Sequence, residues 1–272
     1  MIVSIQGIKG AFHEEAARQY FSENIDILEQ ITFKEVISSV KQGAAHYGVM
    51  AIENTISGTI GSNLELIKQS GLTIVGEIDL KIEQHLVVNK GIKIDEITEV
   101  ESHYMAINQC RPFFDNYPDI RLKESEDTAL SMRNIVQNRL RHVGAIGSQL
   151  GAQFYGLDII ERNIQSHCQN YTRFLILEYS PVEPSGYNKS TIHLTVSKNK
   201  CGLTEVLSHF TERCMTLCKI ESLPIQGYPW QYQYYLDLNF QDTTSFEDAI
   251  NSLNKDIQSL TVLGKYKQHT TQ

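Results

Sequence analysis

Two adjacent polar residues stand at the start of an apolar segment. Residues 170–174 read Asn-Tyr-Thr-Arg-Phe, and the aliphatic run 175–177 follows directly. This pattern predicts a loop that enters a buried strand, and open α/β sheets bind their ligands at strand ends. Thr172 carries a hydroxyl that can donate a proton, and Arg173 carries a permanently charged planar fork that suits a carboxylate. The segment therefore predicts a site for an anion, with a purely structural pair as the alternative.

Other polar groups follow a predicted strand or begin a predicted helix. The run 48–52 reads as a short buried strand, and Glu53 and Asn54 stand at its carboxyl end. Glu126 precedes Asp127-Thr128 and is predicted to begin a helix, where the helix dipole favours an acidic residue. These positions can hold side chains rigidly at a sheet edge.

Ser102 is predicted to cap a helix that runs to about Phe114. Gln109 lies seven residues further on, so the two side chains are expected on one helix face. A cap at Ser102 can direct its hydroxyl, or the free N–H groups of the helix start, at an anion. A plain cap without a ligand is the alternative.

The N-terminal segment predicts a strand over 2–6, a turn over 7–10 and a helix over 13–21. A strand, a glycine turn and a helix start together make an anion-binding geometry. Because only two glycines are present, the segment is not the dinucleotide-binding fingerprint.

The order of predicted elements indicates two domains. Strands alternate with helices through residues 1–179, which predicts an α/β domain. Residues 180–188 are rich in Pro, Ser and Gly and predict a linker. Residues 189–272 then read βαββαβ, the ferredoxin-like arrangement of an α+β domain.

Composition narrows the class of partner. The 272 residues include 24 basic and 32 acidic side chains, which give a net charge of −8. This balance argues against nucleic acid or an anionic membrane as the main partner. No signal-peptide pattern opens the chain, and no apolar run approaches the roughly 18 residues of a membrane span. Five scattered cysteines suit a reducing compartment, so we expect a cytoplasmic protein without a metal site.

Five segments, in matching order, resemble prephenate dehydratase followed by an ACT regulatory domain. The resemblance covers nearly the whole chain, and each segment is weak alone but specific in combination. The segments are Gly7–Ala17, Ile52–Thr55 with Gly58, Ser102-His103 with Gln109-Cys110, Glu126 with Thr128, and Asn170–Phe174.

The resemblance implies a reaction in which prephenate loses its ring hydroxyl and ring carboxylate to give phenylpyruvate, without metal or cofactor. It assigns Thr172 to the leaving hydroxyl. The other catalytic positions that it implies are Asn54, Gln109, Glu53 and Ser102. The substrate-binding positions are Arg173, Asn170, Glu126, Ala11 and Phe174. Since neighbouring strand residues face opposite ways, Arg173 is either a substrate ligand or an internal brace.

The chain departs from the family pattern at several positions, of which four bear most on function. Ala11 stands where Ser or Thr is usual, which removes a hydroxyl donor. His13 stands where Ser is usual, and its ring can supply the donor that Ala11 lacks. The ACT resemblance implies a phenylalanine site at Gly202, Leu203, Glu221, Ser222 and Leu223. There Cys201 replaces a Gly, and Leu223 replaces an Arg and its five donors. We expect phenylalanine to bind with altered affinity.

The resemblance also implies an architecture and its partners. The first 180 residues are expected to fold as two α/β lobes around a cleft, as in periplasmic binding proteins. ACT edges imply a homodimer or a tetramer. Two alternatives stay open: a non-catalytic aromatic amino-acid sensor, which Ala11 favours, and a dehydratase that acts on arogenate.

Overall fold

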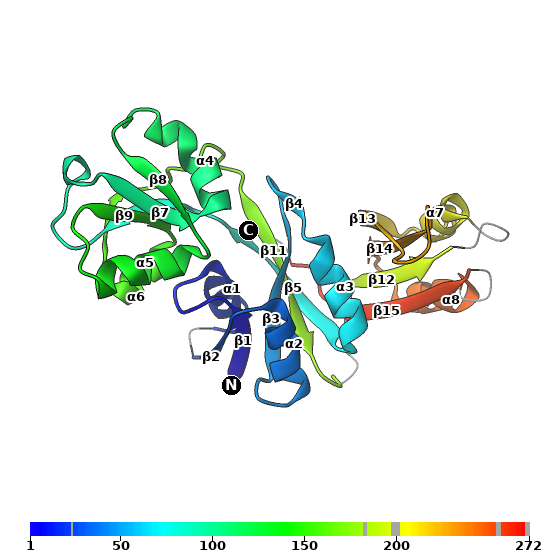
Figure 1. Cartoon of the computed structure of the whole chain (residues 1–272). Helices are drawn as coiled ribbons and strands as arrows, with labels where there is room; N and C mark the ends of the chain where they lie inside the picture. Colours follow the sequence, from blue (N-terminus) through cyan, green and yellow to red (C-terminus); the bar gives the residue numbers. More distant parts are fainter. Residues whose placement is uncertain (23, 182–183, 197–201, 254–256, 270–272) are drawn as a thin grey trace. The chain divides into compact units, whose positions relative to one another are not determined.

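The computed structural model describes all residues except 23, 182–183, 197–201, 254–256 and 270–272 (Figure 1). The chain divides into two compact units, each built from two stretches. The first unit is Met1–Gly58 with Asp79–Phe174, and the second is Thr59–Ile78 with Leu175–Gln272. Strands β5 (Thr73–Lys81) and β11 (Tyr171–Glu178) therefore each belong to both units. The domain boundary that composition predicts at 180–188 differs from this division into compact units, and it stays a prediction.

The first unit begins with a parallel α/β lobe. Its central strand, β1, pairs in parallel with β2 on one side and β3 on the other. Helices α1 and α2 alternate with these strands in the chain, as the sequence predicts. The elements are β1 (Ile2–Gln6), α1 (Phe12–Phe21), β2 (Asp26–Gln30), α2 (Phe33–Lys41) and β3 (Tyr47–Asn54), followed by the short strand β4 (Gly58–Thr59).

A second sheet in the same unit forms another lobe. Its strand order is β10-β6-β9-β7-β8, with β7 parallel to both β8 and β9. The apolar side chains of these strands and of α4 form a buried core. The elements are β6 (His85–Val88), the 3₁₀ helix η1 (Ile94–Glu96), β7 (Glu99–His103), α4 (Tyr104–Phe114), β8 (Arg121–Ser125), α5 (Thr128–Gln137), β9 (Val143–Gly147), α6 (Gln149–Tyr155) and β10 (Asp158–Glu161). The predicted two-lobed α/β arrangement is confirmed.

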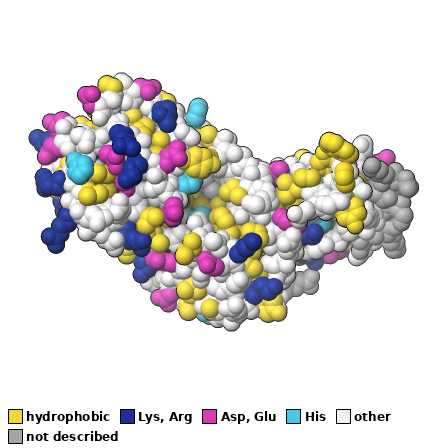
Figure 2. All heavy atoms as spheres, viewed as in Figure 1, with side chains coloured by type: hydrophobic (Ala, Val, Ile, Leu, Met, Phe, Trp, Pro, Cys, Tyr) yellow, Lys and Arg dark blue, Asp and Glu magenta, His cyan; other side chains and the backbone are white. Residues whose placement is uncertain are grey.

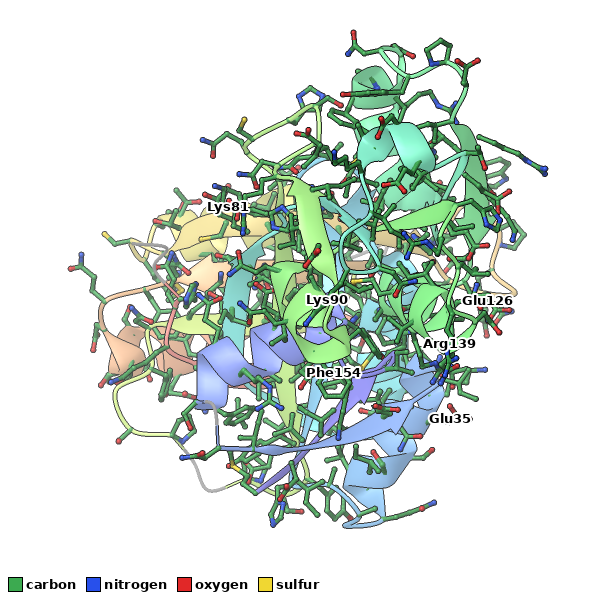
Figure 3. The ribbon with its side chains drawn as sticks, turned by 90° about the vertical axis from the view of Figure 1, so that its left-hand side faces the viewer. Glu35, Lys81, Lys90, Glu126, Arg139 and Phe154 are labelled. Atoms are coloured by element: carbon green, nitrogen blue, oxygen red, sulfur yellow. The ribbon has the colours of Figure 1, made fainter. Side chains whose placement is uncertain are left out.

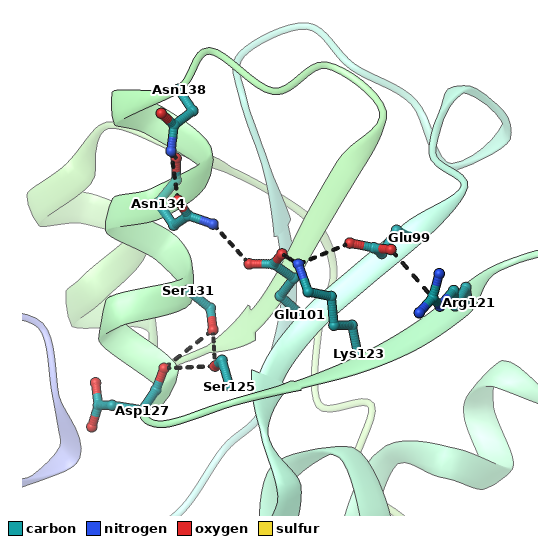
Figure 4. Close-up of polar contacts among 9 residues, drawn as sticks. All are labelled: Glu99, Glu101, Arg121, Lys123, Ser125, Asp127, Ser131, Asn134 and Asn138. Carbon is teal, nitrogen blue, oxygen red and sulfur yellow. Dashed lines mark hydrogen bonds and ion pairs between the residues drawn. The ribbon is translucent and has the colours of Figure 1, made fainter.

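Polar contacts hold β7, β8 and α5 of this lobe together (Figure 4). Glu101 on β7 is buried; it accepts from Lys123 on β8, and from Asn134 on α5 at 2.9 Å. Asp127 caps α5, because its Oδ1 accepts from the backbone N–H groups of residues 129 and 130 at 2.8 and 3.0 Å. The helix predicted at this point is confirmed. Glu126, one residue earlier, is exposed (Figure 3).

The second unit contains an antiparallel sheet with two helices. The strand order β13-β14-β12-β15 in the chain order βαββαβ confirms the predicted ferredoxin-like arrangement. Its core includes Val206 and Phe210 of α7, Leu236 and Leu238 of β14, and Phe246 of α8. The elements are α3 (Gly61–Ser70), β12 (Lys189–Thr195), α7 (Leu203–Thr211), β13 (Thr216–Pro224), β14 (Tyr232–Asn239), α8 (Thr243–Leu253) and β15 (Ser259–Tyr266).

A glycine lets β15 approach β5 within the second unit. Gly264 pairs with Ile74 in a parallel register. A Cβ atom at Gly264 would lie 2.1 Å from the carbonyl oxygen of Ile74, which is far inside contact distance. The close approach of two backbones therefore requires glycine at this position.

Candidate active site

Asn54, the last residue of β3, is held at both ends of its side-chain amide. Its Oδ1 accepts from the backbone N–H groups of Ile56 and Ser57 at 3.0 and 2.9 Å. Because a backbone N–H can only donate, the amide oxygen must face these two groups. The Nδ2 group then points the other way and donates to Thr172 Oγ1 at 2.9 Å, to Asn170 Oδ1 at 2.8 Å and to the Tyr171 carbonyl at 3.1 Å.

This geometry gives Thr172 a defined orientation at the start of β11. The Asn54 amide occupies one lone pair of the hydroxyl oxygen. That bond leaves the hydroxyl hydrogen available for donation to another group. Thr172 is half-buried, so its side chain keeps some access to solvent. The pair can present a polarised hydroxyl donor to a ligand.

Asn170 extends the contact into the second lobe. It is fully buried, and its Nδ2 donates to Gln109 Oε1 on α4 at 3.0 Å. The side chains of Gln109, Asn170, Asn54 and Thr172 thus form one continuous hydrogen-bonded row. We call these four side chains the amide row. All four are positions that the family resemblance implies, and the structure brings them together.

Thr55 supports the amide row, and sequence reasoning assigned it no role. Its Oγ1 accepts from the Tyr171 N–H and donates to the Gln169 carbonyl, both at 3.0 Å. Its own N–H donates to the Tyr171 carbonyl at 2.9 Å. The segment after β3 is thereby fixed to the segment before β11. The sequence does contain a hint of this role, because Thr55 is a second side chain with hydrogen-bonding capacity directly after Asn54.

The prediction that Ser102 caps a helix is wrong. Strand β7 continues through His103, because Ser102 and His103 pair in register with Glu124 and Ser125 of β8. The Ser102 side chain is fully buried and donates to the Ile146 carbonyl at 2.8 Å. Helix α4 begins at Tyr104, and His103 is its cap. The shared helix face expected for Ser102 and Gln109 is therefore also absent.

Most of the remaining predicted site residues are buried. Arg173 is 9% exposed, Phe174 is 1% exposed, and Glu53 is half-buried at the end of β3. Strand alternation places Thr172 and Phe174 on one face of β11 and Arg173 on the other. Ala11 is 2% exposed at the start of α1, where its methyl group belongs to an apolar cluster.

The glycine turn before α1 binds a carboxylate of the same chain. The Gly10 N–H donates to the buried carboxylate of Glu14 at 2.6 Å. The Gly10 carbonyl accepts from Ser148 Oγ at 2.8 Å, and the Lys9 carbonyl accepts from the Tyr155 hydroxyl at 2.8 Å. In this structure the turn joins α1 to α6, and one of the donors expected to hold a bound anion is occupied by Glu14.

His13 lies beside the aromatic residue of the Thr-Arg-Phe segment. Its ring meets Phe174 edge-on at a centroid distance of 5.0 Å and lies 5.5 Å from Phe33. Burial lowers the pKa of His13 to about 4, so the imidazole is neutral at pH 7. Its Nε2 is buried without a hydrogen-bond partner among the described residues.

The residues predicted to bind phenylalanine lie on α7 and β13 of the second unit. Gly202 precedes α7, while Glu221, Ser222 and Leu223 follow one another along β13. A Cβ atom at Gly61 would lie 2.9 Å from Leu223 Cδ2, so this side chain packs against the start of α3. Leu203 is half-buried at the start of α7. Cys201 is outside the described residues.

Charges of both signs are mixed over the face of the molecule shown in Figure 2. Basic and acidic side chains lie together over the second lobe in this view. Ion pairs within this lobe join Arg121 to Glu99 and Arg141 to Glu96. Among the described residues, no helix combines the length and apolar character needed to cross a membrane.

A model of the prephenate dehydratase family matches residues 3–181. A bifunctional chorismate mutase/prephenate dehydratase from Enterobacter agglomerans is 33% identical to this chain over 271 residues. The alignment covers 97% of this chain and 70% of that protein. The matched residues contain the whole amide row.

Two solved structures resemble the chain over nearly its full length. The prephenate dehydratase of Arthrobacter aurescens in complex with L-Phe has a TM-score of 0.88 at 25% identity and covers 98% of this chain and 90% of its own. The prephenate dehydratase of Staphylococcus aureus subsp. aureus Mu50 has a TM-score of 0.84 at 28% identity and covers 98% of this chain and 100% of its own.

Proposed function

This chain belongs to the prephenate dehydratase family, and on that premise we propose how its own residues perform the reaction. The enzyme converts prephenate to phenylpyruvate, water and carbon dioxide. The hydrogen bond from Asn54 to Thr172 is the observation that carries our proposal.

The chemistry requires a donor at the departing hydroxyl. As the carboxylate leaves as carbon dioxide, its bonding electron pair enters the ring and the C–O bond to the hydroxyl breaks. The aromatic product drives this step, but hydroxide is a poor leaving group unless it is protonated or strongly hydrogen-bonded. Catalysis by a positioned acid is worth about 10²–10⁴ in rate. Thr172 is the donor to the leaving hydroxyl in our proposal: its proton completes the water molecule, and the threonine oxygen then regains a proton from solvent, to which its half-buried side chain has access.

Asn54 makes the weak donor Thr172 more effective. By donating to Thr172 Oγ1, the amide polarises the hydroxyl and stabilises negative charge that develops on its oxygen. The amide is fixed before the reaction begins, so no reorganisation is needed when the C–O bond breaks. Asn170 and Gln109 are positioning residues that hold Asn54 and Thr172 in this arrangement.

The other predicted site residues receive roles that follow from their burial. Arg173 has a structural role on the face of β11 opposite Thr172. Its 9% exposure supports this assignment. Ser102 holds the end of β7 through its bond to the Ile146 carbonyl. Phe174 and Ala11 are buried apolar residues that support the site by packing. Glu53 orients neighbouring donors. Glu126 is exposed and receives no role in the proposed chemistry.

The ferredoxin-like part of the second unit is an ACT domain that senses phenylalanine in our proposal. The prephenate dehydratase of Arthrobacter aurescens, which the chain resembles, was solved with L-Phe bound. Leu223 replaces an arginine and packs at Gly61, which supports an altered phenylalanine affinity. Calorimetry with the full chain tests the idea, and no heat with phenylalanine at millimolar concentration contradicts it.

The domain limits and the assembly are part of the same proposal. We assign residues 1–179 to the catalytic domain and 189–272 to the ACT domain. Strand β13 is outermost in its sheet and carries the exposed side chains Leu217 and Ile220, which supports a homodimer or tetramer through this edge. A cytoplasmic location completes the proposal.

A turnover assay tests the catalytic proposal and separates it from its alternatives. The full chain is incubated with prephenate, and phenylpyruvate is measured by its absorbance in alkali. Thr172→Ala should lower turnover about 10²-fold or more, whereas Thr172→Ser should keep most of it. Arogenate in parallel measures substrate preference. An intact fold without turnover on either substrate would favour the sensor alternative.

A further inference from the structure

A polar cavity lies in the first unit. Its volume of about 460 Å³ is within the range of small-molecule sites. The walls come from α1, from the stretch that runs from the end of β5 to the start of β6, and from α6. The residues that line it are Glu15, Arg18, Gln19, Lys81, Glu83, His85, Gln149, Leu150 and Gln153. None of them belongs to the amide row, and Lys81 is labelled in Figure 3.

Most charged and polar groups of this cavity have partners on the protein. Lys81 Nζ donates to Glu83 Oε1 at 2.7 Å. Two guanidinium nitrogens of Arg18 donate to Glu14 Oε1 at 2.6 and 2.8 Å. The Nδ1 of His85 accepts from the backbone N–H of residue 163 at 3.1 Å. These bonds orient Arg18 and His85, while the Lys81–Glu83 pair is exposed and can adjust to a ligand.

Glu15 differs from these three residues. Its Oε2 is buried and has no hydrogen-bond partner among the described residues. A carboxylate oxygen without a donor is costly when it is removed from water. Burial, with a further contribution from the negative charge of Glu83, raises the pKa of Glu15 to about 7. The cavity therefore contains an acceptor that lacks a donor.

We propose that this cavity binds a small α-amino acid, whose ammonium group donates to Glu15. An ammonium group supplies both the missing N–H donor and the compensating positive charge. Lys81 and Arg18 on the same walls attract the carboxylate of such a zwitterion. The side-chain amides of three glutamines line the remaining surface, and Leu150 is the only apolar lining residue.

The lining also selects against an aromatic side chain. A phenyl ring needs apolar contact surface, and one leucine among nine lining residues supplies little of it. The ligand is therefore expected to carry a small or polar side chain. This distinguishes the cavity from the phenylalanine site proposed on α7 and β13.

Binding can be measured on the full chain with three probes. Glycine carries both charged groups, methylammonium carries only the cation, and acetate carries only the anion. Titration followed by saturation-transfer NMR should give saturable binding of glycine with a dissociation constant on the order of 1 mM. Methylammonium should bind more weakly than glycine, and acetate more weakly still.

Substitutions decide whether the probe occupies this cavity. Glu15→Gln replaces an acceptor oxygen by a donor and should weaken glycine binding about 10-fold or more. Glu83→Gln should also weaken glycine binding, because the cavity loses a negative charge. The Glu83 side chain is 39% exposed, so this substitution should not disturb folding. Glu126→Gln, at an exposed carboxylate outside the cavity, and Thr172→Ala should leave glycine binding unchanged. Absence of saturable glycine binding, or equal affinity in wild type and both cavity variants, would overturn the proposal.

Discussion

The side-chain nitrogen of Asn54 lies 2.9 Å from the hydroxyl oxygen of Thr172 and donates a hydrogen bond to it. The opposite end of the Asn54 amide accepts from two backbone N–H groups, so the donor cannot rotate away without losing both bonds. The residues come from strands 118 positions apart in the chain. The orientation of the Thr172 hydroxyl, our proposed donor, is therefore a property of the folded first unit and depends directly on Asn54.

Asn54→Asp should impair catalysis, and it should also cost about 1–3 kcal/mol of stability because Asn170 Oδ1 and the Tyr171 carbonyl lose their donor. The new carboxylate still accepts from the backbone N–H groups of Ile56 and Ser57, but it cannot donate to Thr172. We expect kcat to fall about 10²-fold, comparable to the loss of one oxyanion donor, with a smaller change in KM. Steady-state kinetics with prephenate provide the measurement.

The double variant shows whether Asn54 and Thr172 act as a unit. Asn54→Asp combined with Thr172→Ala should be about as slow as Thr172→Ala alone, because effects within a catalytic unit are not additive. Asn116→Asp, at an exposed asparagine, is the matched control and should keep wild-type kinetics. Fully multiplicative losses in the double variant would contradict the proposed coupling.

Asn170→Leu should reduce stability as well as activity. Asn170 is fully buried and bonded to both Asn54 and Gln109. Leucine leaves the Gln109 oxygen without its donor and removes an acceptor from Asn54, at a cost of about 1–3 kcal/mol. Urea unfolding measures this loss. Gln109→Leu, at the half-buried end of the row, should lower the free energy of unfolding by less than Asn170→Leu does. Equal losses of stability in the two variants would argue against a burial effect.

The members of the amide row could be predicted because each belongs to a short segment with a recognisable family pattern. Thr172 and Asn170 share one segment, while Asn54 follows a clear apolar strand. Their mutual bonds could not be predicted, since they depend on how β3, β11 and α4 are placed by tertiary packing. The role of Thr55 was missed for the same reason: its partners lie more than 100 residues away.

Ser102 shows why a local pattern can mislead. A serine before a helical apolar pattern is typical of a cap. Here parallel pairing with β8 extends β7 through His103, and tertiary pairing overrides the local preference. The βαββαβ order of the second unit was predictable because its strands alternate regularly. The division into two compact units was not, since it depends on long-range contacts of residues 59–78.

The ion pair between Glu77 and Lys189 in the second unit should be essential for stability. Lys189 Nζ donates to both carboxylate oxygens of Glu77 at 2.9 Å, and the side chains are only 7% and 1% exposed. Lys189→Met leaves the Glu77 charge buried without its counterion, which should cost about 3–5 kcal/mol. Urea unfolding of the variant provides the measurement.

A double variant and an exposed pair serve as controls for that result. Replacing Glu77 by Leu together with Lys189→Met removes both charges, and the double variant should be more stable than Lys189→Met alone. Lys81→Met breaks an ion pair whose side chains are 47% and 39% exposed, and it should change stability by less than about 1 kcal/mol. A double variant less stable than Lys189→Met would contradict the argument.

Glu15 and His13 affect stability in opposite directions over overlapping pH ranges. Burial raises the pKa of Glu15 from 4.5 to about 7 and lowers the pKa of His13 from 6.5 to about 4. Between pH 4.5 and 7 the folded state holds a proton on Glu15 that the unfolded state has released, so stability falls as pH rises. Between pH 6.5 and 4 the unfolded state protonates His13 and the folded state does not, so stability falls as pH decreases.

Glu15→Gln should therefore stabilise the protein above pH 7 relative to wild type. The glutamine amide has the shape of the protonated carboxyl group and carries no charge, so it avoids the cost of ionising Glu15 in place. The gain should be close to zero near pH 4, rise between about pH 4.5 and 7, and level off above pH 7 at no more than about 3 kcal/mol. Urea unfolding of variant and wild type at the same pH cancels the contribution of His13, which both proteins share. A difference in stability that does not change between pH 5 and pH 8 would show that the Glu15 carboxyl titrates normally in the folded protein.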